Sequence, residues 1–385
     1  MKTLRLGIIG LGNMGKAHAN SILSGQVPRC ELTALVDSNV DTLNAFPTVK
    51  AFTTSTELIH SGEVDAVLIA TPHYSHTTIG IEALQAGLHV LVEKPISVHK
   101  ADCEKLIAAH RSKKQVFAAM FNQRTDPYYL KLRKLIQTGQ LGEIRRVNWI
   151  ITNWFRTHAY YASGGWRATW AGEGGGVLLN QCPHQLDLWQ WLFGMPQSLR
   201  AFCQIGRYHD IEVEDDVTAY MHYKNGATGV FITSTGEAPG TNRLEVTGEQ
   251  GRVVIENDKF SFIRNEVPMS EFSRTTSGGF ATPPTWNIDI PVQGHGGQHV
   301  EIIQNFTAAI LDKAPLIAPA KEGIYSVELG NAMLFSSFQN KTIEFPLNAK
   351  SYETFLRKKI ASSTFVKKTS TAKLDESDFS KSFAK

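Results

Sequence analysis

The chain has few cysteines, no long apolar run and no large excess of charge. Its four cysteines among 385 residues lie far apart, with no CxxC pair, which favours reduced thiols over a disulfide framework and indicates no metal site. With 39 basic and 36 acidic residues the formal net charge is +3, too balanced for a nucleic-acid-binding surface. No apolar run approaches about 18 residues, so no membrane span is predicted. We therefore expect a soluble, cytoplasmic protein that binds neither nucleic acid nor membranes.

The length and the spacing of the apolar runs indicate two α/β domains. A chain of 385 residues exceeds what one hydrophobic core usually supports. Up to about residue 121, short β-branched runs alternate with segments of helical period, which predicts βαβ units and a buried parallel sheet. Beyond residue 197, strand-like runs follow one another through Asn-Gly and Glu-Gln-Gly turns, which predicts a mostly antiparallel sheet. The expected limits are 1–121, 122–365 and, for a polar disordered tail, 366–385.

Helix boundaries are marked most clearly after the first domain. In DPYYLKLRKLIQTG, Asp126 can cap a helix, Pro127 suits its first position and Gly139 can end it. Two further helical patterns lie at about 297–311 and 321–337. The second domain is therefore expected to combine its sheet with helices.

A glycine-rich turn directly follows the first predicted strand. In RLGIIGLGNMG, Gly10, Gly12 and Gly15 form a G-x-G-x-x-G pattern between a strand and a helical segment. Such glycines serve a tight turn, the close approach of a pyrophosphate and close helix-strand packing, with the phosphate at the helix N-terminus. We expect Gly10, Gly12, Asn13, Met14 and Gly15 to bind a dinucleotide. The alternative is a turn that only connects the strand to the helix.

An acidic residue ends the next predicted strand. Asp37 follows Gly15 by 22 residues, where a carboxylate can accept both hydroxyls of the adenosine ribose. The carboxylate would repel a 2′-phosphate, and no arginine follows at once, so NAD is favoured over NADP. The alternative is a solvated acid in a turn.

Two further strand ends point to the edge where parallel sheets bind ligands. ATPHYSH brings Thr71, Pro72 and His76 to this edge, and VLVEKPIS brings Glu93 and Lys94. A lysine between a buried strand and a proline is held in place, and the charge of an oxidised nicotinamide would lower its pKa. Lys94 is therefore predicted to polarise a substrate hydroxyl or exchange a proton with it. The alternative is a sheet-edge lysine paired with Glu93.

Polar side chains interrupt the apolar segment GGGVLLNQCPHQLDLWQW. If residues 176–193 are helical, Asn180 and His184 lie on one face, with Asp187 one turn further along. Pro183 must begin or kink that helix, because proline removes a backbone hydrogen bond. A lone histidine on an apolar helix is most often a core residue, but the lysine and the dinucleotide pattern favour His184 as a proton acceptor. Asp187 is expected to position its neighbours.

Together these motifs resemble the glucose-fructose oxidoreductase / inositol dehydrogenase / rhizopine-catabolism (Gfo/Idh/MocA) family over about residues 1–345. The glycine pattern, ATPHYSH, EKP and GGG-x-L-x-N-x-x-x-H-x-x-D carry the resemblance. It implies an N-terminal Rossmann domain and a C-terminal α/β domain, which binds substrate through an open, mostly antiparallel sheet that often forms the oligomer interface. It also implies NAD(P)-dependent chemistry on hydroxyls of sugars, sugar derivatives or cyclitols. A homodimer or homotetramer is expected.

Residue by residue, the resemblance implies that Lys94 and His184 are catalytic. The family's aspartate four residues before the histidine is Asn180 here, and an amide can orient or bind a hydroxyl but cannot relay a proton. The segment GGWR, which includes Trp166, and the segment FNQRTDP, with Asn122 on the cofactor side, also match.

An aromatic segment supplies the expected substrate side. NWFRTHAYYASGGWRATWAGEGG interleaves rings with arginines, a pattern that suits the apolar faces and hydroxyls of pyranoses. The alternative is a packing loop or an oligomer contact. His295 and His299 are further pocket candidates. The residues expected to bind substrate are Lys94, Arg156, Trp166, Arg167, Asn180 and His184.

The sequence therefore predicts an NAD-dependent sugar or inositol dehydrogenase. A hydride would pass between a ring carbon and the nicotinamide, while His184 accepts the hydroxyl proton and Lys94 stabilises the alkoxide. Two alternatives stay open: an NAD-dependent glycosidase or lyase that oxidises the ring transiently, and a non-catalytic sugar or cofactor sensor.

Overall fold

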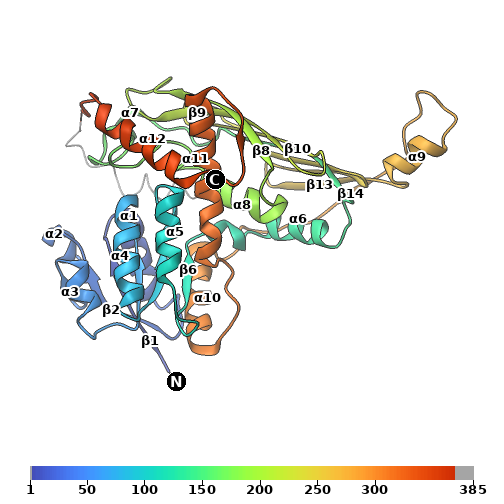
Figure 1. Ribbon diagram of the computed structural model, residues 1–385. Coiled ribbons are helices and arrows are strands. Elements are labelled where there is room, and N and C mark those ends of the chain that lie inside the picture. The colour runs from blue at the N-terminus through green and yellow to red at the C-terminus, as the bar shows by residue number, and fades with distance from the viewer. Residues whose placement is uncertain (1, 369–385) are drawn as a thin grey trace.

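A computed structural model describes residues 2–368 and divides them between two sheets, drawn blue and green to yellow in Figure 1. The first sheet is parallel and the second is mixed and mostly antiparallel, which confirms the predicted fold class. The predicted tail lies outside the described residues from position 369 onward.

The first sheet is doubly wound. Over the described residues its strand order is β3-β2-β1-β4-β5-β6, so the order reverses between β1 and β4, where such sheets bind ligands. The strands are β1 (Leu4–Ile9), β2 (Cys30–Val36), β3 (Lys50–Phe52), β4 (Ala66–Ile69), β5 (His89–Val92) and β6 (Phe117–Ala119). The helices between them are α1 (Asn13–Leu23), α2 (Val40–Leu43), α3 (Ser55–Ile59), α4 (His73–Gln85) and α5 (Lys100–Ala109).

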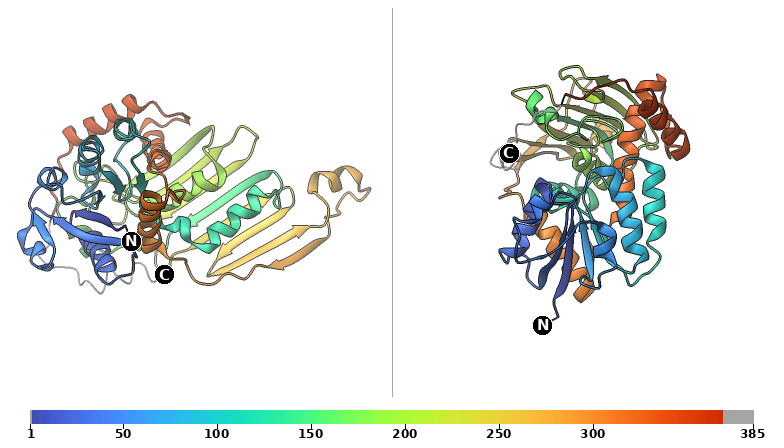
Figure 2. Two further views of the ribbon diagram at one scale, coloured as in Figure 1. Left: turned by 90° about the horizontal axis from the view of Figure 1, so that it is seen from below. Right: turned by 90° about the vertical axis from the view of Figure 1, so that its left-hand side faces the viewer.

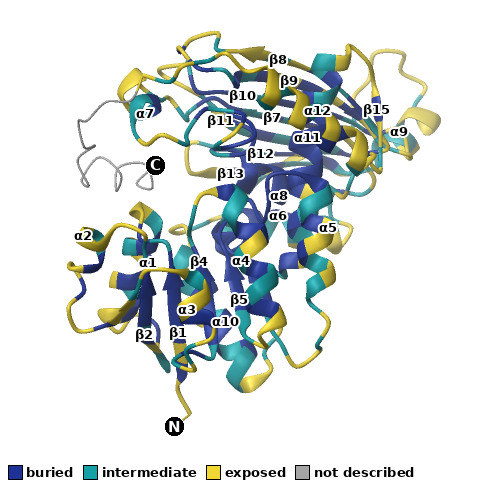
Figure 3. Ribbon diagram, turned by 60° about the vertical axis from the view of Figure 1, so that its left-hand side comes forward, coloured by how far each residue is buried: buried dark blue, intermediate teal, exposed yellow. Residues whose placement is uncertain are grey.

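The central strands of this sheet are covered on both faces. Leu6, Leu68 and Leu91 are all 0 % exposed, and Figure 3 shows these strands in dark blue between partly exposed helices. Burial on both faces is the reason that the strands read as uninterrupted apolar runs rather than as alternating ones.

The second sheet follows the order β14-β13-β12-β11-β7-β10-β9-β8-β15 over the described residues. Its β7 and β10 pair in parallel, while the predicted Asn-Gly and Glu-Gln-Gly turns join the antiparallel pairs β9-β10 and β11-β12. The strands are β7 (Ile144–Ile151), β8 (Ser198–Ile205), β9 (Glu214–His222), β10 (Thr228–Ser234), β11 (Asn242–Gly248), β12 (Gly251–Glu256), β13 (Lys259–Asn265), β14 (Thr285–Asp289) and β15 (Ile343–Glu344).

Helices cover one face of the second sheet. On β9 Ala219 and Met221 point into the core, whereas Tyr220 between them is 49 % exposed. The remaining helices are η1 (Asn122–Thr125), α6 (Pro127–Gln137), α7 (His158–Ala162), α8 (Pro183–Phe193), α9 (Met269–Thr275), α10 (Gln298–Asp312), η2 (Ala320–Glu322), α11 (Gly323–Gln339) and α12 (Ala349–Ser362). Figure 2 shows α9 at the tip of the hairpin between β13 and β14, away from both cores. None of the helices within residues 2–368 is long and apolar enough to cross a bilayer.

Helix α10 packs with the first domain, although the sequence placed residues 122–365 together. Its apolar stripe of Ile302, Ile303 and Phe306 is buried in the same core as the parallel sheet. The stripe is amphipathic but carries no mark of which sheet it covers. The chain therefore returns to the first domain after β14, before β15 joins the second sheet beside β8.

The segment before α8 is not helical, so the predicted helix over 176–193 is wrong in its first half. The Val177 N–H donates to Glu214 O at 3.0 Å, and the Leu178 N–H donates to the Glu214 carboxylate at 3.0 Å. A side chain at Gly176 would clash with the Glu214 carbonyl. The glycine run thus lies against the start of β9, and α8 begins only at Pro183, where a missing N–H costs nothing.

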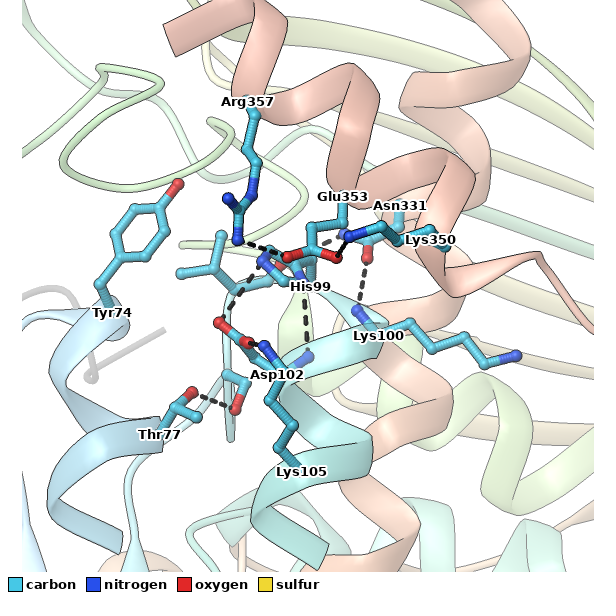
Figure 4. A network of polar contacts seen from close by, with 12 residues as sticks. Tyr74, Thr77, His99, Lys100, Asp102, Lys105, Asn331, Lys350, Glu353 and Arg357 are labelled. Carbon is cyan, nitrogen blue, oxygen red and sulfur yellow. Dashed lines mark hydrogen bonds and ion pairs between the residues drawn. The ribbon is translucent and has the colours of Figure 1, made fainter. Parts of the chain in front are cut away.

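Buried polar contacts tie α5 of the first domain to α11 of the second and to Leu347 just before α12, and Figure 4 draws the contact of Lys100 with Asn331. The buried Lys100 ammonium donates to Glu328 Oε1 at 2.8 Å and to Leu347 O at 2.9 Å. The Lys100 backbone N–H donates to Asn331 Oδ1 at 3.0 Å. Buried charges are retained only where they are well paired, so these contacts hold the two domains together on this side.

Candidate active site

The glycine turn between β1 and α1 has the form of a phosphate cradle. Gly10 has φ +93°, a conformation that L side chains rarely adopt, and a side chain at Gly15 would clash with the Gly10 carbonyl. A Cβ at Gly12, in contrast, would meet no atom within 4 Å. Exposed Gly12 and Asn13 and half-buried Met14 begin α1. Gly10 and Gly15 are thus needed by the fold itself, while the space over Gly12 is left for a ligand.

This difference predicts that two alanine substitutions act on different properties, Gly15→Ala on stability and Gly12→Ala on cofactor binding. Gly15→Ala is expected to destabilise the fold by about 1–3 kcal/mol, because the methyl group overpacks the turn. Gly12→Ala is expected to cost less than about 1 kcal/mol yet to weaken NADH binding at least about tenfold, a loss of about 1.4 kcal/mol. Urea unfolding and NADH fluorescence titration measure the two effects. Unchanged NADH affinity in Gly12→Ala would contradict the cradle.

Asp37 faces the same turn from the end of β2. One carboxylate oxygen accepts the Leu11 N–H at 2.7 Å and the other accepts the Asn39 N–H at 2.8 Å. The carboxylate is therefore fixed next to the glycine turn. This is the position at which a carboxylate accepts ribose hydroxyls in dinucleotide-binding sheets.

The turn after β4 contributes Thr71 and Pro72, and His76 supports it from behind. Thr71 Oγ1 is buried and has no hydrogen-bond partner. His76 is 0 % exposed, and its ring nitrogens lie 2.8 Å from Pro95 O and 2.8 Å from Thr71 O. His76, which the sequence placed at the cofactor, therefore joins two turns and offers neither ring nitrogen to a ligand.

Glu93 lies beneath the site rather than on its surface. Its Oε1 is 2.7 Å from His18 Nε2 of α1, and its Oε2 accepts the Lys94 N–H at 3.1 Å. Burial raises the pKa of this carboxyl, but His18, His299 and Lys94 outweigh burial and leave the pKa at about 2. Burial lowers the pKa of His299 to about 4, with Glu93 opposing and His18 and Lys94 adding to the shift. Glu93 is thus a buried anion that anchors the Lys94 backbone.

Lys94 reaches from the first domain to the second. Its Nζ donates to the backbone carbonyl of Asn180 at 2.9 Å. Burial lowers the pKa of Lys94, Glu93 and Glu173 oppose that shift, and Arg167 adds to it. Lys94 is therefore held at the junction of the domains by one neutral acceptor, not paired with Glu93 at the sheet edge.

His184 lies in the first turn of α8, buried and close to Lys94. The Nδ1 atom has no hydrogen-bond partner among the described residues. Burial lowers the pKa of this ring well below 6.5, and the charges of Lys94 and His299 add to the shift. The imidazole is therefore neutral at neutral pH, with a buried ring nitrogen that has no partner. In native proteins such atoms are rare and require an explanation.

The aromatic segment places two arginines around one tyrosine. The guanidinium carbons of Arg156 and Arg167 lie 5.1 and 5.0 Å from the Tyr160 ring, and Arg167 Nη1 donates to the Tyr160 hydroxyl at 3.1 Å. The Trp166 ring meets the buried His73 ring edge-on at 5.2 Å. Both arginines act on the pKa of Lys94, so the structure brings these two expected substrate residues near Lys94.

Asn180 connects the aromatic segment to the glycine run. Its Oδ1 accepts from the Tyr160 hydroxyl at 3.3 Å and from Gln181 Nε2 at 3.3 Å, and its amide nitrogen donates to Glu173. Because Asn180 precedes α8, it is not a helical neighbour of His184. The backbone carbonyl of this turn, rather than the side chain, contacts Lys94.

Residues of η1, between the two domains, hold the domains together at the base of the site. Asn122 Nδ2 donates to Gln298 Oε1 at 2.6 Å, while Asn122 Oδ1 is buried without a partner. Arg124 binds Asp187 through two hydrogen bonds of 2.7 and 2.6 Å and reaches Glu322 at 2.6 Å. Asp187 thus positions α8 and does not face the site, as the sequence led us to expect.

Sequence reasoning missed four residues of the site: His18, His73, Tyr160 and Glu173. Glu173 had a visible signal, because an acid directly before three glycines in an apolar segment is unusual. His295 is not brought in, since it pairs with Asp126 at 3.1 Å and is 49 % exposed. Among residues 2–368 no group of three potential ligands is arranged to hold a metal ion.

Two family descriptions match the chain. One, an oxidoreductase family with an NAD-binding Rossmann fold, matches residues 4–121, and the other, a GFO/IDH/MocA C-terminal domain, matches residues 129–254. The chain is 28 % identical over 266 residues to a myo-inositol 2-dehydrogenase of Thermotoga maritima, covering 66 % of this chain and 75 % of that one. It is 24 % identical to a levoglucosan dehydrogenase of Pseudarthrobacter phenanthrenivorans, covering 90 % and 99 %.

Solved structures share the two-domain fold of this chain. The WlbA dehydrogenase from Chromobactrium violaceum, in complex with NADH and UDP-GlcNAcA, superposes with a TM-score of 0.78 at 25 % identity. The superposition covers 90 % of this chain and 97 % of that one. The similarity therefore extends over both domains and the junction between them.

Proposed function

Because the chain belongs to the GFO/IDH/MocA oxidoreductase family and carries its NAD-binding Rossmann domain, we propose that it transfers a hydride between NAD and a ring hydroxyl carbon of a sugar, sugar derivative or inositol. One observation carries the proposal. The buried His184 Nδ1 has no partner, and it lies near a lysine that reaches the same place from the other domain.

The cofactor side of the site fits a dinucleotide. The open space over Gly12, the fixed Asp37 carboxylate, and the unpartnered Thr71 Oγ1 and Asn122 Oδ1 lie around one edge of the parallel sheet. When bound, NAD supplies the hydride acceptor. Asp37 supports NAD over NADP, because a 2′-phosphate would meet a carboxylate.

The protein side of the chemistry rests on two groups with different roles. A neutral His184 accepts the proton of the substrate hydroxyl, for which its lowered pKa prepares it. The Lys94 ammonium hydrogen bonds the same oxygen and stabilises the negative charge that develops there. The reverse reaction, reduction of a ketone, uses the same two groups in the opposite direction.

The substrate class is supported by the segment around Tyr160. Rings of Trp166 and Tyr160 offer apolar faces, and Arg156, Arg167 and Asn180 offer planar polar groups. This combination binds carbohydrate hydroxyls together with their C–H faces. The names of relatives that act on inositol and levoglucosan agree with this class. A homo-oligomer and a cytoplasmic location remain predictions from the sequence.

The test is a panel of sugars, glycosides and inositols incubated with NAD and, separately, NADP. We expect at least one compound to produce reduced nicotinamide with NAD, and Lys94→Ala to abolish that signal while retaining NADH binding. Glycoside turnover without accumulation of NADH would instead establish the transient-oxidation chemistry. If no compound is turned over and Lys94→Ala matches the wild type in every ligand-induced stability shift, the dehydrogenase proposal is wrong.

A further inference from the structure

Glu173 is a buried carboxylate between the aromatic segment and the glycine run. It is 1 % exposed. Its Oε2 accepts the Ala168 N–H at 2.6 Å, and its Oε1 accepts from the side-chain amide of Asn180. Ala168 directly follows Trp166 and Arg167 and has φ +55°. One carboxylate thus holds both the loop of the expected substrate residues and the amide that faces them.

This carboxylate has no basic side chain of its own. Among residues 2–368 no ion pair within 4.0 Å joins Glu173 to a lysine, arginine or histidine, and the same holds for the buried Glu214, whereas the buried acids Asp187 and Glu93 are paired with Arg124 and His18. Burial raises the pKa of Glu173, and Arg167, Asn180 and Ala168 offset part of that shift. A buried charge costs several kcal/mol unless other groups compensate for it, and here the two hydrogen bonds from Ala168 and Asn180 supply part of that compensation.

Asn180 connects Glu173 to Lys94, because its side-chain amide donates to the Glu173 carboxylate while its backbone carbonyl accepts Lys94 Nζ at 2.9 Å. Lys94 is desolvated, and the carboxylates that favour its ammonium form are Glu93 and Glu173. The Glu93 carboxylate already pairs with the His18 ring at 2.7 Å. The charged or titratable groups around Lys94 are Glu93 beside it directly after β5, Arg156, Arg167 and Glu173 from the segment before α8, His73 and His76 of α4, His184 of α8 and His299 of α10. Glu173 is therefore the one acid of this set that is neither adjacent to Lys94 in the chain nor paired with a histidine.

We propose that Glu173 is a positioning residue of this site, which holds the Asn180 amide and the Ala168 backbone in place and adds negative charge that favours the ammonium form of Lys94. Because Glu173 accepts from the amide nitrogen, it turns Asn180 Oδ1 toward Tyr160 and Gln181. The inference rests on the proposed function, since Lys94 and Asn180 are the groups that would meet the substrate.

An exchange of two side chains tests the proposal. In Glu173→Gln the charge is lost, and a carboxamide, whose oxygen accepts but whose NH2 group only donates, cannot replace both carboxylate oxygens that accept from Ala168 and Asn180. In the double variant Glu173→Gln/Asn180→Asp, the new glutamine donates to the new aspartate while its oxygen still accepts from Ala168. The double variant therefore restores both hydrogen bonds and the single negative charge, with amide and carboxylate exchanged.

The readout is the pH dependence with which trace acetic anhydride acetylates Lys94, measured by peptide mass spectrometry on the full chain without substrate. We expect the midpoint for Lys94 to fall by about one pH unit in Glu173→Gln, as for the loss of a nearby opposite charge. The double variant should recover at least half of that fall. Glu212→Gln is the matched control, because Glu212 accepts the Trp170 N–H of the same segment but is not among the groups that contribute most to the Lys94 pKa. It should leave the midpoint unchanged.

Two results overturn the proposal: a Lys94 midpoint that is unchanged in Glu173→Gln, or a double variant that recovers less than half of the shift. Acetylation requires neither NAD nor a sugar, so failure here is distinct from failure of the substrate panel. Once a substrate is identified, kcat in the double variant should exceed kcat in Glu173→Gln. A merely structural role would also predict recovery of kcat, but it would leave the pH dependence of Lys94 acetylation unmoved, so the acetylation midpoint is the measurement that decides.

Discussion

A His184→Asn variant is expected to lose about 10²- to 10⁴-fold in kcat, which is the usual contribution of a positioned general base. Asparagine keeps a polar group at the start of α8 but has no nitrogen that can take up a proton. NADH binding should persist, because the glycine turn and Asp37 lie on the other domain. Steady-state kinetics with the substrate found in the panel, together with NADH titration, separates the two properties.

The pH dependence of kcat/KM provides a second, independent test of His184 as the base. The imidazole is the base only when neutral, and burial and Lys94 keep its pKa well below 6.5. Oxidation by the wild type should therefore retain kcat/KM below the pH at which an ordinary histidine becomes charged, and fall only in stronger acid. His110→Asn is the control, since His110 lies at the end of α5 and contacts Gln115 O at 3.0 Å. A His184→Asn variant with wild-type kcat would remove this residue from the mechanism.

Arg124→Met is expected to destabilise the protein by about 3–5 kcal/mol, the cost of leaving a buried charge without its partner. Arg124 and Asp187 are each 1 % exposed and share two hydrogen bonds. Burial already raises the pKa of Asp187 and Arg124 opposes that shift, so loss of the guanidinium raises the pKa further. The folded variant then binds a proton more tightly than the unfolded chain, and its loss of stability should shrink as the pH is lowered.

Urea unfolding at two pH values measures this effect, and two further variants locate its cause. Arg124→Met/Asp187→Leu should recover most of the lost stability, because the unpaired acid is gone. Arg133→Met should cost less than about 1 kcal/mol, since Arg133 stacks on Trp191 at 3.9 Å without an ion pair among the described residues. Equal losses in Arg124→Met and Arg133→Met would show that stacking, not the buried charge, is what matters.

The features that the sequence predicted well depend on near neighbours in the chain. The turn glycines, the Asp126 cap with Pro127, and the hairpin turns act within a few residues, and each produces the expected element. Asp126 accepts the Tyr128 N–H at 2.9 Å, as a helix cap should. Lys94 was singled out at the end of a strand and His184 within a predicted helix, and the structure places the two near each other from different domains. Their catalytic role stays a prediction.

The features that were missed depend on contacts between distant segments. The parallel pairing of β7 with β10 joins strands about 80 residues apart, and no local turn records it. The first half of the predicted helix over 176–193 is pulled onto β9 by Glu214. The meaning of Glu173 likewise depends on the folded path of an aperiodic loop that brings Asn180, Ala168 and Lys94 around one carboxylate.

The buried contacts of Lys100 have an entropic consequence for ligand binding. They connect α5 to Glu328, Asn331 and Leu347 on the side shown in Figure 4. Since Lys94 and His184 come from different domains, their separation would fluctuate if the domains were free to move apart. A fixed junction preorganises the two halves before any ligand arrives, so that less conformational freedom is lost on association and more of the contact energy remains as affinity.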